Sequence, residues 1–276
     1  MLHLRRSHAL EHCERPQPPR RDPTVALLRP MALAGALLLG ASAPRPAQAG
    51  ANDAIHLAWN DCRAGAAASA DLVFDCFSNT ELFQLVCGLT LSATLDSVIA
   101  VEVVVDVQHQ DPALPAWWQV GTSGCRALAL EASAGLQSTS ECAGAWGPSG
   151  LALLQGFDVG QPRGGANQVR IRAVAAVVSD SARTWSAATP YAVLTLSLDS
   201  RFSSGTGACT GCIPGACLVL NSMLVKRLPG GTGDVFLSNP WMGDGNRVTW
   251  QGGGSADCEA VPIRRATWGQ VKSLYR

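Results

Sequence analysis

The stretch Ile99–Gln108, IAVEVVVDVQ, decides the fold class of this chain. Its odd-numbered positions are all Ile or Val, whereas the even-numbered positions include Glu102 and Asp106. A period of two over ten residues, with so many β-branched side chains, is typical of a strand with one buried face. The sequence therefore predicts a long strand here, with its valines toward a core and its two acids on a solvated face.

The same alternation predicts further strands along the chain. They are expected at residues 55–59, 168–173, 191–198, 218–225, 235–237 and 247–251. Gly, Pro, Ser and Asp clusters separate them, and Asp244-Gly245-Asn246 is a plausible hairpin turn between Trp241 and Trp250. Helical pattern is confined to short stretches near 179–187 and 268–275. We therefore expect an all-β chain, an antiparallel β-sandwich of jelly-roll type with about eight to ten strands.

Residues 1–49 are organised like a secretory leader. A segment rich in Arg and Pro precedes Ala32–Ala43, which is almost entirely Ala, Leu and Gly, and Ala47-Gln48-Ala49 has the small-x-small form of a cleavage site. The apolar run is shorter than the roughly 18 residues of a membrane span. The alternative is a buried core helix. We expect a signal peptide and export, with Met31 as an alternative start of translation.

The mature chain, residues 50–276, is predicted to be one β-sandwich domain with a Cys-rich last third and a short C-terminal tail. It holds 14 basic and 18 acidic residues, a net charge of −4. This mild acidity argues against a nucleic-acid partner, because nucleic-acid binding depends on clustered positive charge. No other apolar run reaches membrane length, so no stable membrane span is expected after signal removal.

Ten cysteines indicate an oxidising compartment and a disulfide-stabilised domain. Nine lie in the mature chain, and Cys87, which follows an apolar stretch, is the candidate for an unpaired buried thiol. Proximity suggests that Cys62 pairs with Cys76 and Cys125 with Cys142, and that the other four hold the last third together. Eight paired cysteines allow 105 connectivities. The candidates are Cys62, Cys76, Cys125, Cys142, Cys209, Cys212, Cys217 and Cys258.

The spacing Cys209-x2-Cys212-x4-Cys217 leaves a metal site open as an alternative. With Cys258, these thiolates could bind tetrahedral zinc. In an exported protein such thiols are oxidised to disulfides by the surrounding compartment. The second Cys-x2-Cys motif of the usual pair is also missing from the sequence. Disulfides are therefore the favoured prediction, and no metal or cofactor is expected.

Catalytic motifs are missing from the sequence. It contains neither G-x-S-x-G, nor H-E-x-x-H, nor a Walker loop. His56 and His109 are interpreted as outward-facing or loop residues. Glu102 and Asp106 would lie about 13 Å apart along one strand, beyond the roughly 5–9.5 Å that separates glycosidase carboxylates. We expect no enzyme, and the alternative is a secreted carbohydrate-active hydrolase whose acids and tryptophans line a cleft.

Eight tryptophans stand against two tyrosines, and several lie near predicted turns. Exposed tryptophans on sandwich loops can stack on sugars or anchor a protein. The alternative is that they fill the ends of the sandwich, as large apolar side chains usually do. Trp59 is assigned to the core, and the possible ligand-contact aromatics are Trp117, Trp118, Trp146 and Trp241.

Several motifs carry a resemblance. They are LAWNDC at 57–62, LPAWW at 114–118, CTGC at 209–212 and TWGQVKSLYR at 267–276. With the leader, they resemble a group of uncharacterised secreted bacterial proteins with a TWGxVKSLYR-type tail, which implies export and a shared fold. The general strand pattern is also similar to cohesin-like sandwiches, modules that hold partners rather than turn over substrates, which implies a binding role by analogy. The tail could close the domain or serve as a sorting address.

These observations converge on an exported, non-catalytic extracellular or cell-surface module with a binding or structural role. Its expected partner is an unknown protein or carbohydrate. A structural role in a surface layer would be indicated by a continuous exposed apolar patch or an open sheet edge.

Overall fold

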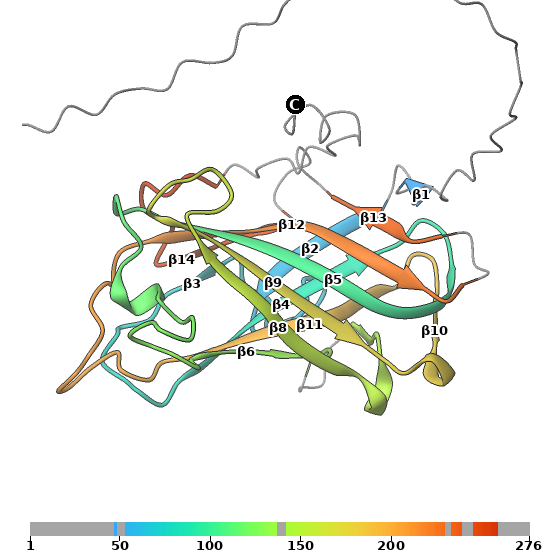
Figure 1. Cartoon of the computed structure of the whole chain (residues 1–276), viewed down its shortest axis with the longest axis horizontal. Helices are drawn as coiled ribbons and strands as arrows, with labels where there is room; N and C mark the ends of the chain where they lie inside the picture. The colour runs from blue at the N-terminus through green and yellow to red at the C-terminus, as the bar shows by residue number, and fades with distance from the viewer. Residues whose placement is uncertain (1–46, 49–52, 137–141, 230–232, 239–244, 259–276) are drawn as a thin grey trace, which may run out of the picture. The chain divides into compact units, whose positions relative to one another are not determined.

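Two β-sheets packed face to face form the protein (Figure 1). The computed structural model describes residues 47–48, 53–136, 142–229, 233–238 and 245–258. One core cluster draws buried side chains from the strands of both sheets, such as Val105 from one and Leu196 from the other. The predicted all-β sandwich, mainly antiparallel, is confirmed.

The large sheet has nine strands. Its main path is β1 (Ala47–Gln48), β13 (Val235–Leu237), β12 (Ala216–Arg227), β5 (Leu95–His109), β9 (Gln168–Ala176) and β8 (Leu151–Val159). Off this path, β14 (Arg247–Trp250) pairs with β12 and with β3 (Asp71–Leu72), and β10 (Arg183–Trp185) pairs with β5. β5 is thus an interior strand, with Val105 opposite Leu220 on one side and Ile171 on the other.

The small sheet has five strands. They are β2 (Ala54–Trp59), β4 (Leu82–Thr90), β11 (Pro190–Asp199) and β6 (Leu130–Ser133) in order, with β7 (Ala143–Gly144) also beside β11. β4 was not predicted, because its sequence LFQLVCGLT does not alternate. The structure explains this, since Val86, pointing away from the main core, packs in a second cluster with Cys62 and Ala192. Cys87 is the buried free thiol, as predicted.

The valines of β5 confirm the strand that defines the fold. Val101, Val103, Val105 and Val107 are all buried in the core cluster. Asp106, however, does not lie on a solvated face: it is buried and accepts hydrogen bonds from the guanidinium of Arg170, at 2.7 and 2.8 Å, and from the amide of Asn221. Strand neighbours on the outer face satisfy this carboxylate, which the sequence of β5 alone cannot show.

The hairpin turn predicted at Asp244-Gly245-Asn246 lies partly outside the described residues, as does Trp241 before it. The described strands on either side, β13 and β14, both pair antiparallel with β12, one after the other along the same edge. The helical prediction is wrong. The stretch 179–187 is not a regular helix: it holds the short 3-10 helix η3 (Ser179–Ser181) and then β10, which continues the edge of β5 beyond β9. The other 3-10 helices of the described residues are η1 (Ala116–Trp118) and η2 (Gly147–Ser149). The tail at 268–275 lies outside the described residues.

Eight cysteines form four disulfides, but with a connectivity that sequence proximity does not give. The pairs are Cys62–Cys142, Cys76–Cys212, Cys125–Cys209 and Cys217–Cys258. The pairings of Cys62 with Cys76 and of Cys125 with Cys142 are therefore wrong, and only Cys217–Cys258 lies within the last third. The fold brings segments that are distant in the sequence next to one another, so bonds form between residues 41 to 136 positions apart. The alternative of a zinc site is wrong too, because Cys209, Cys212, Cys217 and Cys258 are all in disulfides.

No helix in the described stretches is both long and apolar enough to cross a bilayer.

Candidate functional site

An open groove lies at one end of the sandwich, between two loops. One loop, residues 73–81, joins β3 to β4, and the other, residues 200–215, joins β11 to β12. We call them the groove loops. The groove has a volume of about 540 Å³. It is lined by Cys76, Phe77, Ser203, Ser204, Gly205, Ala208, Cys209, Thr210, Gly211, Cys212, Ile213 and Pro214.

The tryptophans expected to contact a ligand are buried instead. Trp117 and Trp118 pack in an aromatic cluster around Trp250, whose ring centroid lies 4.7 Å from that of Trp117. Trp146 is buried against Trp185. The apolar area of these rings favours burial, and internal acceptors satisfy two of their N–H groups: Trp117 donates to Ser203 Oγ and Trp146 to the carbonyl of Val193.

The three described candidates, Trp117, Trp118 and Trp146, are therefore not contact residues. Trp241 lies outside the described residues. Trp59 is in the core, as predicted.

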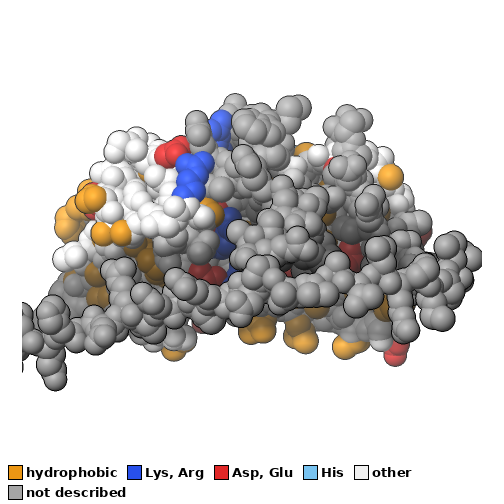
Figure 2. All heavy atoms as spheres, turned by 45° about the horizontal axis from the view of Figure 1, so that its top comes forward, with side chains coloured by type: hydrophobic (Ala, Val, Ile, Leu, Met, Phe, Trp, Pro, Cys, Tyr) orange, Lys and Arg blue, Asp and Glu red, His pale blue; other side chains and the backbone are white. Residues whose placement is uncertain are grey.

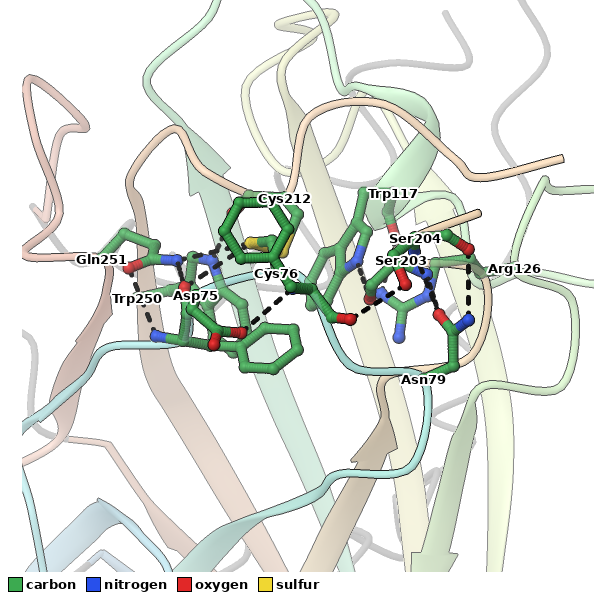
Figure 3. Close-up of a disulfide and its surroundings, with 12 residues drawn as sticks. Asp75, Cys76, Asn79, Trp117, Arg126, Ser203, Ser204, Cys212, Trp250 and Gln251 are labelled. Atoms are coloured by element: carbon green, nitrogen blue, oxygen red, sulfur yellow. Dashed lines mark hydrogen bonds between the residues drawn. A yellow bond between two sulfur atoms is a disulfide. The ribbon is translucent and has the colours of Figure 1, made fainter. Parts of the chain in front are cut away.

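The Cys76–Cys212 disulfide joins the two groove loops directly (Figure 3). On one side of it, the Gln251 side chain accepts from the N–H of Phe74 and donates to the carbonyl of the same residue. Trp250 Nε1 donates to the carbonyl of Cys212 at 2.8 Å. The disulfide is thus anchored to the residues at the end of β14.

Asn79 holds the other side of the groove. Its Oδ1 accepts from the N–H groups of Ser203 and Ser204, at 2.8 and 3.0 Å, and its Nδ2 donates to the carbonyl of Ser204 (Figure 3). Ser204 Oγ in turn donates to the carbonyl of Phe77. One amide side chain therefore replaces the backbone pairing that a regular sheet would provide between these loops.

Arg126 is a buried cation beneath the loops, without a carboxylate in ion-pair contact. Its guanidinium donates to the carbonyls of Trp117, Asp199 and Arg201 and lies 3.7 Å from the Trp117 ring centroid. Burial lowers the pKa of Arg126 to about 10, partly offset by Asp199. The side chain stays charged at neutral pH and ties three segments together. This role of Arg126 is not predictable from the sequence, because a lone Arg in a loop belongs to no recognisable pattern.

The rim of the groove is apolar and exposed. Phe77 is 78% exposed and Ile213 is 67% exposed, and Val73 and Phe202 of the same loops are also exposed. Figure 2 shows orange hydrophobic side chains at the left-hand end of the molecule, the end of the groove loops in Figure 1. The residues lining the groove include no Asp, Glu, His, Lys or Arg. Sequence reasoning missed Phe77 and Ile213, since irregular loops have no period from which exposure can be predicted.

The two histidines of the described residues, His56 and His109, each contact partners of their own. His109 is fully buried beside Trp118, contrary to the expected outward-facing position, and its Nδ1 accepts from the N–H of Asp111. His56 is half-buried, with Nε2 3.3 Å from Thr90 Oγ1. Burial lowers the pKa of both side chains. Among the described residues, no group of three His, Cys, Asp or Glu side chains could hold a metal ion.

Comparisons with known proteins add a fold likeness only. No protein-family model and no curated protein matches the chain. Among solved structures, the chain is similar to a cohesin module from a family 33 glycoside hydrolase of Clostridium perfringens, with 12% identity and a TM-score of 0.33. The similarity covers 72% of this chain and 95% of that module.

Proposed function

We propose that this protein is an exported, non-catalytic binding module of the extracellular space or cell surface, and that the groove is its ligand site. The observation that carries the proposal is an open groove whose apolar rim is exposed while its two loops are immobilised. Loops held in one conformation lose little entropy on binding, so they favour affinity. Exposed apolar side chains on such loops are otherwise a liability, which supports a role for them in recognition.

Export is supported by the disulfides and by the leader-like sequence of residues 1–49. Four disulfides indicate folding in an oxidising environment. We propose that cleavage after Ala49 releases residues 50–276 as a single domain that ends in a short C-terminal tail.

The chemistry of the groove supports binding rather than turnover. A glycosidase needs two carboxyl groups flanking the bond that breaks, and none of the described residues that line this groove carries a carboxyl group. The Ser203 hydroxyl accepts from Trp117 and the Ser204 hydroxyl donates to a backbone carbonyl, so neither is positioned by a base as a nucleophile. The hydrolase alternative has no observation in its favour here.

The test compares two pairs of exposed apolar residues. The full chain is produced in a bacterial host that exports it and forms its disulfides. Its binding to washed cells and to extracellular matrix of bacteria is then titrated. Phe77→Ser with Ile213→Ser should weaken binding about tenfold or more, since burial of one such side chain contributes about 1.5–3 kcal/mol. Leu151→Ser with Leu153→Ser on β8 is the matched control. Equal binding by both double variants would refute the groove as the site.

A further inference from the structure

We propose that the ligand of the groove is a neutral saccharide, bound with a sugar face against Phe77. This inference rests on the proposed function and narrows it to one ligand class. It is carried by three features of the groove, namely its charge, its exposed aromatic ring and the hydroxyl groups beside that ring.

The lining of the groove offers no charge to an ionic ligand. No charged side chain is among its described lining residues. Asp75, next to Cys76 in the chain, accepts a hydrogen bond from the N–H of Phe77 at 3.0 Å, and Arg201 pairs with Asp199. Desolvating an acidic or basic ligand here would bring no compensating ion pair. The charge of the site therefore matches a neutral ligand.

Phe77 provides a fixed apolar platform. Its N–H donates to Asp75 and its carbonyl accepts from Ser204 Oγ, so its backbone is held on both sides while its ring stays exposed. The face of an aromatic ring carries partial negative charge. The C–H groups on one face of a pyranose carry partial positive charge and pack on such a ring, with weak but additive attraction.

Hydroxyl and backbone groups lie within the same groove. Ser203, Ser204 and Thr210 line it, and Thr210 is exposed. Gly211 has a φ of +95°, and a Cβ there would lie 2.2 Å from Pro115 Cβ, so only glycine allows the loop to pass so close. That passage fixes Thr210, whose carbonyl accepts from the N–H of Trp117 at 2.8 Å.

The combination of an exposed aromatic ring with neighbouring hydroxyl groups fits a sugar better than the apolar side chain of a peptide. A sugar presents hydroxyl groups around an apolar face, so it needs directional partners next to a platform. The volume of about 540 Å³ lies within the roughly 300–1,000 Å³ of small-ligand sites. A peptide anchored by one large apolar side chain would be better served by a closed apolar pocket, whereas this groove is open and bears hydroxyls.

The experiment is affinity electrophoresis of the full chain in gels that contain one soluble polysaccharide each. Hydroxyethylcellulose, xylan, mannan and mixed-linkage β-glucan form the neutral set, and alginate and polygalacturonate form the acidic set. We expect retardation in at least one neutral gel. Phe77→Ala should weaken it at least tenfold and Thr210→Val by a few fold, while Leu151→Ala on β8 leaves it unchanged. Unaltered circular dichroism shows that each variant folds.

The outcomes separate this inference from the function on which it rests. Retardation by the acidic set alone, or by neutral gels independently of Phe77, overturns the neutral-saccharide site. A parallel selection with displayed apolar peptides covers the other ligand class. Phe77-dependent peptide binding without sugar binding overturns the saccharide but leaves the binding module standing. If no Phe77-dependent binding occurs in either arm, both proposals fail.

Discussion

Two regions of the molecule expose large apolar side chains, and they are built in opposite ways. The groove loops expose Phe77 and Ile213. They are held by disulfides, by the hydrogen bonds of the Asn79 amide and by the buried guanidinium of Arg126. β8 exposes Leu151, at 72%, and Leu153, at 65%, from a regular strand that pairs, among the described residues, with β9 alone. Exposed apolar area is therefore common to both regions, and the immobilised irregular backbone beneath it distinguishes the groove loops, which is the difference on which the proposed function rests.

The largest effect is expected from removing the Cys76–Cys212 disulfide with Cys76→Ala and Cys212→Ala. The bond closes a segment of 136 residues, and a loop of about 100 residues corresponds to about 4.7 kcal/mol of unfolding free energy in the chain-entropy model. Urea unfolding should show a loss of about 2–5 kcal/mol. Hydrogen exchange should show lost protection in the groove loops but not in β8 and β9. Equal loss of protection in both regions would contradict the comparison.

Arg126→Met should come next, with a loss of about 3 kcal/mol of unfolding free energy, because three carbonyls lose their donor and the bond to Trp117 among them is buried. Chemical denaturation measures it. The matched control is Arg172→Met, beside β8, whose half-exposed guanidinium pairs with Asp158. That change should cost less than about 1 kcal/mol. A comparable loss from both substitutions would show that Arg126 has no special role under the groove.

A smaller effect is expected from acid. Burial lowers the pKa of His109 and His56 below the ordinary value of 6.5. As the pH falls, the unfolded chain therefore takes up protons before the folded chain does. The stability that comes from the neutral histidines is fully present above pH 6.5 and is lost as the pH drops below that value. Calorimetry from pH 7.5 to 5 should show a falling melting temperature, with a shallower slope in His109→Gln. A melting temperature that rises over this range would contradict the burial of these rings.

The smallest effect is expected on β8. Leu151→Ser with Leu153→Ser removes only exposed apolar surface, so unfolding free energy should change by less than about 0.5 kcal/mol. Sedimentation velocity provides the sharper measurement, since an open apolar edge can recruit a second strand. A shift from dimer to monomer in this variant would make β8 an interface and break the contrast with the groove.

The alternating strands were predictable because their pattern is local. β5, β9 and β2 each carry their buried face in their own sequence. β4 was missed because Val86 is covered on the outer side by Cys62, which comes from another segment. The cysteines that bond were predictable from composition, but the partner of Cys76 was not, since it depends on which loops share an end of the sandwich.

The candidate site was less predictable than the fold, for a related reason. Tryptophans near turns were expected to reach outward, yet Trp117 and Trp146 have acceptors inside the protein. Phe77 is exposed because Asp75 and Ser204 fix its backbone with the ring outward. Such contacts between residues distant in sequence decide exposure in loops, where no periodicity reveals it.

The Cys217–Cys258 bond also has a mechanical meaning. It joins Cys258 to the second residue of β12, a strand that is hydrogen-bonded to β5 on one side and to β13 and β14 on the other. Tension applied to the chain beyond residue 258 therefore passes across the sulfurs into an interior strand, and the 40 residues between the two cysteines bear none of it. To extract β12, a pulling force must shear ladders on both of its edges together. Under such a load, the two ladders of β12 carry the force and the segment that closes the disulfide loop is shielded from it.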